Sequence, residues 1–177
     1  MKIVISSNSV WNLVNFRIGL IQALIHNNYQ VICLIPKGES TQSLKGLAIK
    51  VREVPMNPIG TNIFTEIKYF INLLNILYKE RPSYYLGFTI KPNIYGALIS
   101  KFLGIRAILN VTGLGSSFLK RDFVTKITFF LYRIAFSSAS YVFFQNKDDQ
   151  QLFFENKILL HQRTKILPGS GVDLNKF

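Results

Sequence analysis

The stretch QVICLI, residues 30–35, gives the clearest indication of the fold of this 177-residue chain. After its first residue the stretch is apolar without alternation, which is typical of a strand that is covered on both faces. Similar short runs recur, and segments with helical periodicity lie between them. Predicted strands cover residues 2–7, 29–35, 48–54, 83–88, 105–111, 140–144 and 164–167. Predicted helices cover residues 12–27, 61–80, 92–103, 122–137 and 147–156, with a weak helical turn at 41–46.

Strands that alternate with helices in this way predict an α/β fold, because right-handed crossovers then build a parallel sheet. We expect a Rossmann-like, doubly wound parallel sheet of about seven strands with helices on both faces. In such a sheet ligands bind outside the carboxyl ends of the strands. The loops that matter for function are therefore 7–12, 88–93, 111–121, 144–148 and 168–173.

The amino-acid composition indicates which kinds of ligand or binding partner the chain favours. Lys and Arg number 21 against 9 Asp and Glu, and the net charge of +12 favours nucleic acid, a bilayer surface or a phosphorylated substrate. Cys33 is the single cysteine, so a reducing cytoplasm fits, and with two separated histidines we expect no metal site. The opening MKIVISSNSV lacks the shape of a secretory signal, and the uncharged run 18–36 is too polar for a membrane span.

The loop after the first predicted strand argues against a classical nucleotide cofactor. Its sequence SSNSVWN contains no glycine, whereas a dinucleotide fingerprint needs glycines there so that the backbone can approach the pyrophosphate. In the helix that follows, Arg17 falls on the same inward stripe as Leu13, Leu20 and Leu24. Arg17 either directs its charge at a substrate phosphate or carboxylate, or reaches solvent or pairs with a carboxylate of the protein.

The segment TIKPNIYG, residues 89–96, follows the fourth predicted strand. Pro92 suits the first position of a helix, and the helix N-terminus would then face the cleft as an anion site. Lys91 and Asn93 are candidates for ligand contact, with simple capping of the helix as the alternative.

Two glycine-containing loops and one helix start add further candidates. In NVTGLGSSF, residues 110–118, Thr112, Gly113, Gly115 and Ser116 form a loop whose backbone amides can approach a ligand, with a plain turn as the alternative. Asn146 is the predicted N-cap of the helix at 147–156, and a ligand role is the less favoured alternative. The last predicted strand leads into a turn made of Pro168, Gly169, Ser170 and Gly171.

The helix predicted at 122–137 carries the best indication of a partner. Phe123, Ile127, Phe130 and Ile134 form a stripe that we expect to face the core. The residues expected on the far side suit an anionic membrane interface, with a second protein layer as the alternative. They are Lys120, Arg121, Lys126, Phe129, Tyr132, Arg133 and Phe136. Because no other helix or strand interleaves bases with aromatic residues, we expect no nucleic-acid partner. The helix at 61–80 is expected to cover the sheet with the stripe Phe64, Ile67, Ile71, Leu74 and Tyr78.

Taken in order, NFRIGLIQAL, TIKPNIYGALISK, NVTGLGSSF, FFQNKDDQQLF and ILPGSGVDLNKF resemble bacterial glycosyltransferases of family 4, in particular those that extend undecaprenyl-diphosphate-linked sugars for surface polysaccharides or glycans. The resemblance implies one half of a GT-B fold. Residues 1–167 would be the acceptor-binding domain, and residues 168–177 would begin the linker to a donor-binding domain that this chain lacks. A chain without that donor-binding domain is expected to transfer no sugar by itself.

The resemblance also implies substrates and site residues. The donor would be a UDP-sugar, no separate cofactor would be needed, and the enzyme would work with retention at the inner face of the bacterial membrane. The implied contacts to acceptor or donor phosphate are Arg17, Lys91, Pro92, Asn93, Thr112, Gly113, Gly115, Asn146, Gly169 and Gly171. Leu114 stands where many relatives have a histidine, so a histidine-centred role there is in doubt. The alternative function is a non-catalytic subunit that recruits a separate donor-binding partner to the membrane.

Overall fold

The computed structural model describes the whole chain except residues 59, 61, 115–122, 160–162 and 172–177. The described residues form a seven-stranded parallel sheet with the order β3-β2-β1-β4-β5-β6-β7. The predicted α/β class and doubly wound arrangement are confirmed, since each predicted strand is present. The strands are β1 Lys2–Ser6, β2 Gln30–Pro36, β3 Ile49–Val54, β4 Tyr84–Phe88, β5 Arg106–Val111, β6 Tyr141–Phe144 and β7 Thr164–Ile166.

The helices lie close to their predicted positions, with two differences. They are α1 Val10–Phe16, α2 Ile18–His26, α3 Ile63–Glu80, α4 Ile90–Leu103, α5 Phe123–Phe136 and α6 Lys147–Glu155, with a 3₁₀ turn at Gln42–Leu44. The helix predicted at 12–27 is broken into α1 and α2 at Arg17, whose backbone leaves the helical region with φ −126° and ψ −2°. The first position of α4 is Ile90 and not Pro92, so the prediction for that helix start was wrong by two residues.

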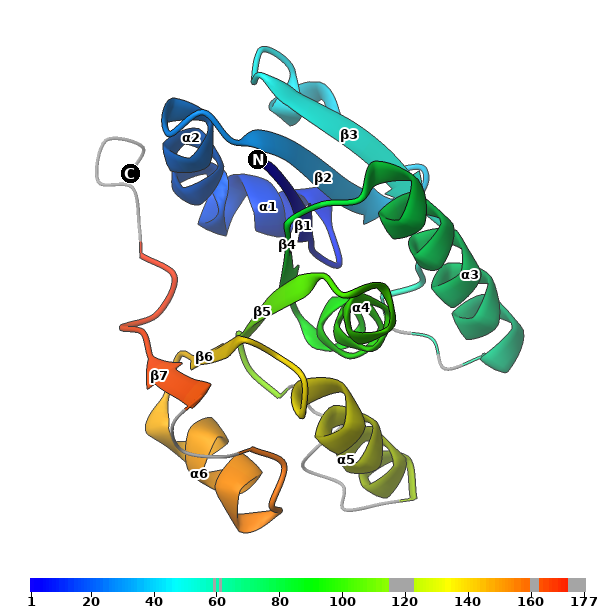
Figure 1. Ribbon diagram of the computed structural model, residues 1–177, viewed down its shortest axis with the longest axis vertical. Coiled ribbons are helices and arrows are strands. Elements are labelled where there is room, and N and C mark those ends of the chain that lie inside the picture. Colours follow the sequence, from blue (N-terminus) through cyan, green and yellow to red (C-terminus); the bar gives the residue numbers. More distant parts are fainter. Residues whose placement is uncertain (59, 61, 115–122, 160–162, 172–177) are drawn as a thin grey trace.

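The sheet is covered on both faces, and β2 shows how its sequence permits this (Figure 1). Val31, Cys33 and Ile35 pack into the core beneath α1 and α2. Ile32 and Leu34 point to the other face, into the core beneath α3, α4 and α5. A strand buried on both sides needs apolar residues at every position, which is why QVICLI shows no alternation.

The inward face of α3 differs from the predicted one. The residues that pack on the sheet are Tyr69, Leu73 and Leu77, all at most 1% exposed. Four members of the predicted stripe point to solvent instead, namely Phe64, Ile67, Ile71 and Tyr78, and Leu74 is half-buried. The helix carries two apolar stripes side by side, so periodicity alone did not identify the one that faces the sheet.

The buried face of α5 likewise differs from the predicted one, whereas Lys126 and Arg133 are exposed as predicted. Tyr132 and Phe136 are buried, and their rings pack against Phe153 of α6 with centroids 5.1 and 5.8 Å apart. Phe129 is half-buried against the same core. The exposed face of α5 carries the apolar side chains expected inside together with two of the predicted bases: Lys126, Ile127, Phe130, Arg133 and Ile134. Lys120 and Arg121 lie outside the described residues.

Candidate functional site

The strand order places a ligand-binding edge between β1 and β4. The chain leaves β1 toward β2 and β3 on one side, and it returns to β4 and β5 on the other. At such a topological switch point the loops at the carboxyl ends diverge and leave room for a ligand. Ser6 at the end of β1 is in register with Gly87 of β4. The residues just after Ser6 and Gly87 therefore meet at the candidate site.

Arg17 lies at this edge, and it is buried. It is 5% exposed, and its guanidinium lies over the ring of Phe88 at the end of β4, with Cζ 4.3 Å from the ring centroid. Its Nη1 donates to the carbonyl of Phe16 at 3.3 Å, whereas Nε is buried without a hydrogen-bond partner. No carboxylate of the described residues forms an ion pair with Arg17. Arg17 is therefore neither exposed to solvent nor paired with a carboxylate of the described residues, which were the two alternatives to a ligand contact.

The electrostatics of Arg17 favour an incoming anion. Burial lowers the pKa of its guanidinium to about 10, which still leaves it positively charged at neutral pH. A buried cation without a counter-ion is unfavourable by several kcal/mol, and a cation–π contact returns only about 0.5–2 kcal/mol of this. A phosphate or carboxylate at this position would meet a charge that is already desolvated and held in place.

Thr89 is a second unusual residue at this edge, and the sequence analysis missed it. It follows Phe88 directly, and its backbone adopts φ 73° and ψ 168°, a region used almost entirely by glycine. It occupies the N-cap position of α4, but its side chain makes no capping hydrogen bond and its Oγ1 is buried without a partner. The residue type gave no signal, because threonine is a common helix cap with ordinary backbone angles.

Lys91 has a structural role in place of the predicted ligand contact. Its ammonium donates to the carbonyl of Asn57 at 2.6 Å, to the carbonyl of Gly60 and to Oε1 of Glu66. These three acceptors use all three N–H groups. Lys91 therefore ties the start of α4 to the loop before α3 and to the first turn of α3, and no N–H remains for a ligand.

Asn93 and Pro92 also hold α4 on the sheet. Asn93 is fully buried, and its Nδ2 donates to the carbonyl of Asn110 in β5 at 2.9 Å. The carbonyl of Pro92 accepts a hydrogen bond from the hydroxyl of Tyr85 at 2.9 Å. The predicted ligand contact by Asn93 is thus replaced by a link between α4 and β5.

The loop after β5 is described only in its first half. Thr112 and Gly113 are half-buried, and Gly113 has φ 137°, a conformation that side chains rarely adopt. Leu114 is buried in the core. Gly115 and Ser116 lie outside the described residues, so the predicted amide-lined loop stays a prediction.

The last two carboxyl-end segments are held by side-chain hydrogen bonds. Asn146 caps α6, since its Oδ1 accepts from the N–H of Asp149 at 2.7 Å, which confirms the capping prediction. Gly169 and Gly171 both have positive φ, 72° and 74°. Ser170 between them accepts from Nε2 of Gln145 at 2.6 Å, which links the turn after β7 to the end of β6.

The described residues contain no group of three His, Cys, Asp or Glu side chains that could hold a metal ion. None of the helices in the same part of the chain combines the length and hydropathy that a membrane span requires. Within the described residues, the notable features of the carboxyl edge are the desolvated Arg17, the strained Thr89 and the glycine turns.

A curated relative in Campylobacter jejuni is 28% identical to this chain over 183 residues. It is the N,N'-diacetylbacillosaminyl-diphospho-undecaprenol alpha-1,3-N-acetylgalactosaminyltransferase. The alignment covers 100% of this chain and 48% of the relative, so the chain spans about half the length of that protein.

Solved structures of similar fold include MurG from Acinetobacter baumannii, with a TM-score of 0.64 at 13% identity over 100% of this chain and 48% of MurG. Anabaena Alr3699/HepE, solved with UDP and glucose, has a TM-score of 0.67 at 16% identity over 99% of this chain and 46% of that protein. The UDP-GlcNAc 2-epimerase of Methanocaldococcus jannaschii has a TM-score of 0.66 at 17% identity, covering 94% and 45% of the two chains. These similarities show a Rossmann-like α/β fold, and this chain spans about half the length of each of these proteins.

The family assignment comes from the sequence. Residues 2–146, which include β1 to β6, match the family described as "Glycosyl transferase 4-like". The match covers most of the chain, and it agrees with the strand order and with the resemblance carried by the loop motifs. The chain belongs to the glycosyl transferase 4-like family.

Proposed function

We propose that this chain is the acceptor-side domain of a glycosyltransferase that moves a sugar from a UDP-sugar to a lipid-linked acceptor. The family assignment supports sugar transfer, and the name of the Campylobacter jejuni relative, which contains a diphospho-undecaprenol, supports a lipid diphosphate as acceptor. The relative's second half would correspond to a donor-binding domain that faces the carboxyl edge of this sheet.

The observation that carries this proposal is the buried, uncompensated charge of Arg17 at the switch point. A diphosphate is the anionic part of such an acceptor, and its oxygens can accept hydrogen bonds from the guanidinium. Arg17 would fix the acceptor so that its sugar hydroxyl points at the donor.

We further propose that the transfer retains the configuration of the donor sugar. The bond between the sugar carbon and the donor phosphate breaks, the acceptor oxygen bonds to that carbon, and the leaving phosphate takes the acceptor's hydroxyl proton. This route requires that the domain orient the acceptor and stabilise the negative charge on the leaving phosphate. Arg17 would meet the first requirement by holding the acceptor diphosphate, and the open end of α4 beside Thr89, a helix N-terminus without a side-chain cap, would meet the second.

The test is Arg17→Met in the full-length protein, with transfer measured as a function of acceptor concentration. Loss of charge-assisted hydrogen bonds of about 1.5–3 kcal/mol predicts a kcat/KM lower by about tenfold to a hundredfold, mainly through KM for the acceptor. Because the variant also removes an unpaired buried charge, its thermal midpoint should be unchanged or higher. A purely structural arginine would instead lower stability and leave KM unaffected.

Arg106→Met is the matched control. Arg106 also lies over an aromatic ring, with Cζ 5.7 Å from the centroid of Tyr84, but it is exposed at the start of β5, at the opposite edge of the sheet. The Arg106→Met variant should transfer sugar at the wild-type rate. Wild-type acceptor KM in Arg17→Met would refute the proposed role.

We also propose that the protein binds peripherally to an anionic membrane through the exposed face of α5. On this face Ile127, Phe130 and Ile134 are between 38% and 61% exposed, and Lys126 and Arg133 lie beside them. Apolar side chains flanked by bases match the interface of a bilayer that carries anionic lipids. A membrane location would also bring the site to a lipid-linked acceptor.

A further inference from the structure

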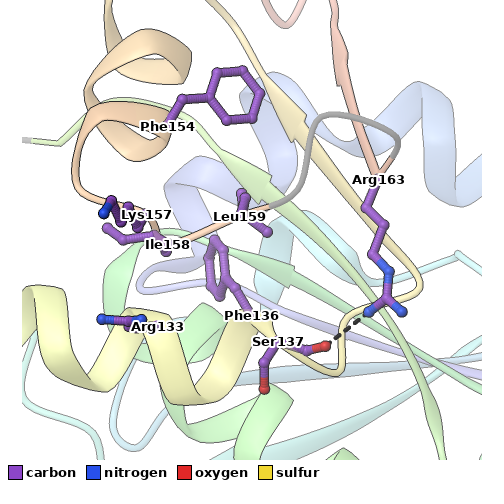
Figure 2. A pocket seen from close by; sticks show the side chains of 8 residues that line it. All are labelled: Arg133, Phe136, Ser137, Phe154, Lys157, Ile158, Leu159 and Arg163. Carbon is purple, nitrogen blue, oxygen red and sulfur yellow. Dashed lines mark hydrogen bonds between the residues drawn. The ribbon is translucent and has the colours of Figure 1, made fainter.

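A pocket lies at the end of α5 that precedes β6 (Figure 2). It is formed where α5 ends before β6 and where α6 ends before β7, so it lies at the amino ends of these two strands. Its volume is about 490 Å³. Nothing in the proposed transfer reaction uses it.

The pocket combines three cations with an apolar floor. Arg133, Lys157 and Arg163 supply the charge, and no acidic side chain is among the described residues that line it. Nη1 of Arg163 donates to the carbonyl of Ser137 at 2.7 Å, which holds this guanidinium at the rim. The apolar floor that water reaches is formed by Phe154 and Leu159, which are half-buried, whereas Phe136 and Ile158, which also line the pocket, are 0% and 4% exposed.

This combination selects one chemical class of ligand. A free phosphate would satisfy the cations but leave the apolar floor in water, and a neutral sugar would leave the cations without a counter-charge. An anion attached to a hydrocarbon satisfies both.

The pocket continues the exposed face of α5. Phe130, Arg133, Ile134 and Ser137 follow one another at helical spacing on that face, and Arg133 and Ser137 also line the pocket. If the apolar side chains of this face rest in a bilayer, the pocket opens at the depth of the lipid headgroups.

We propose that this pocket binds the phosphate-bearing headgroup of an anionic lipid, with the beginning of its hydrocarbon against Phe154 and Leu159. This inference rests on the proposed membrane association and adds a defined headgroup site to it. Bound lipid would hold α5 along the bilayer surface in one orientation, so that the pocket at one end of α5 and the carboxyl edge of the sheet at its other end both stay near the lipid headgroups.

The backbone at Lys157 offers a variant that separates binding from folding. Lys157 has φ 53° just after the end of α6, a left-handed position where glycine is the favoured residue. Lys157→Gly therefore removes a cation from the pocket and relieves the backbone at the same time. Arg81 has φ 45° at the end of α3, across α4 from α5, so Arg81→Gly makes the same two changes away from the pocket.

The experiment is cosedimentation of the full-length protein with vesicles of phosphatidylcholine, with and without phosphatidylglycerol. We expect wild type to bind the anionic vesicles, and Lys157→Gly to bind them about fivefold more weakly, the equivalent of about 1 kcal/mol for one basic residue. Arg133→Gln should show a similar loss. Arg81→Gly should bind like wild type, and none of the three variants should have a lower thermal midpoint.

Two results would overturn the headgroup site. An equal loss in Arg81→Gly would show that net charge, and not the pocket, governs binding. Binding of inorganic phosphate in the absence of lipid, weakened equally by Lys157→Gly, would show a site for free anions.

Transfer to an acceptor dispersed in detergent separates this inference from the proposed function. The Lys157→Gly variant should transfer sugar normally there, because the pocket and Arg17 lie at opposite edges of the sheet. Failure of wild type to bind either kind of vesicle would refute membrane association and the headgroup site together, while leaving the Arg17 experiment as the test of sugar transfer.

Discussion

Replacing Glu80 by glutamine should weaken the fold at neutral pH and much less in acid. Glu80 is the last residue of α3, and its side chain is 9% exposed. Its carboxylate meets three bases: Nζ of Lys50 at 2.6 Å, Nζ of Lys2 at 3.2 Å and Nη2 of Arg52 at 3.2 Å. The hydrogen bond from Lys50 contributes most to lowering the pKa of Glu80, from 4.5 to about 2, and burial opposes it.

The size of the effect follows from this pKa. A fall from 4.5 to about 2 corresponds to roughly 3 kcal/mol of stability for the ionised carboxylate. Lys50 and Arg52 are each 47% exposed, so water and salt screen part of the interaction. We therefore expect Glu80→Gln to lower the free energy of unfolding by about 2 kcal/mol at pH 7.

The lowered pKa also predicts how the stability difference between wild type and Glu80→Gln changes with pH. Because the folded pKa of Glu80 is depressed, its contribution is complete above about pH 4.5 and disappears as the pH falls toward 2. Urea unfolding should show a gap between wild type and Glu80→Gln that is present at pH 7 and reduced to about a quarter of its size at about pH 2.5. Glu155→Gln is the control and should show little gap at any pH, because Glu155 is exposed and its carboxylate accepts a hydrogen bond from the neutral Nε2 of Gln151. An undiminished Glu80→Gln gap in acid would refute the reasoning.

Two further changes test how α4 is positioned. Gly96→Ala should lower the free energy of unfolding by about 3 kcal/mol despite alanine's better helix propensity, because the new Cβ would lie 2.0 Å from Cζ of the buried Tyr85. Gly19→Ala in α2, where nothing lies within 4 Å of the new Cβ, should be neutral or stabilising in the same thermal unfolding assay. Thr89→Gly should raise the free energy of unfolding by about 1 kcal/mol, because glycine adopts φ 73° without strain. A lower thermal midpoint in that variant would show that the Thr89 side chain stabilises the fold more than its backbone strain opposes it.

The strands could be predicted from the sequence because burial on both faces requires an apolar residue at every position. Val31 to Pro36 are all buried, and this requirement leaves a pattern that does not depend on any partner. The N-cap at Asn146 was also predictable, because the capping oxygen and the N–H group that donates to it lie three residues apart. The inward faces of α3 and α5 were not predictable, because Tyr69 and Tyr132 compete for the core with equally apolar neighbours. The choice between such stripes depends on which side chains fit the volume between helix and sheet.

The sequence distance between a side chain and its partners also explains why the roles of the candidate site residues could not be told apart from the sequence. Arg17 and Lys91 both look like cations at the ligand edge of the sheet, and nothing within a few residues of either one separates them. Lys91 is neutralised by groups 25 to 34 residues away in sequence, which only the folded chain brings together. Arg17 forms no ion pair with the described residues, so its charge is available to a ligand. The chain has 21 basic and 9 acidic residues, so an excess of basic charge by itself does not mark a binding site. A binding site therefore requires that the uncompensated cation also be buried, and Arg17 meets both conditions.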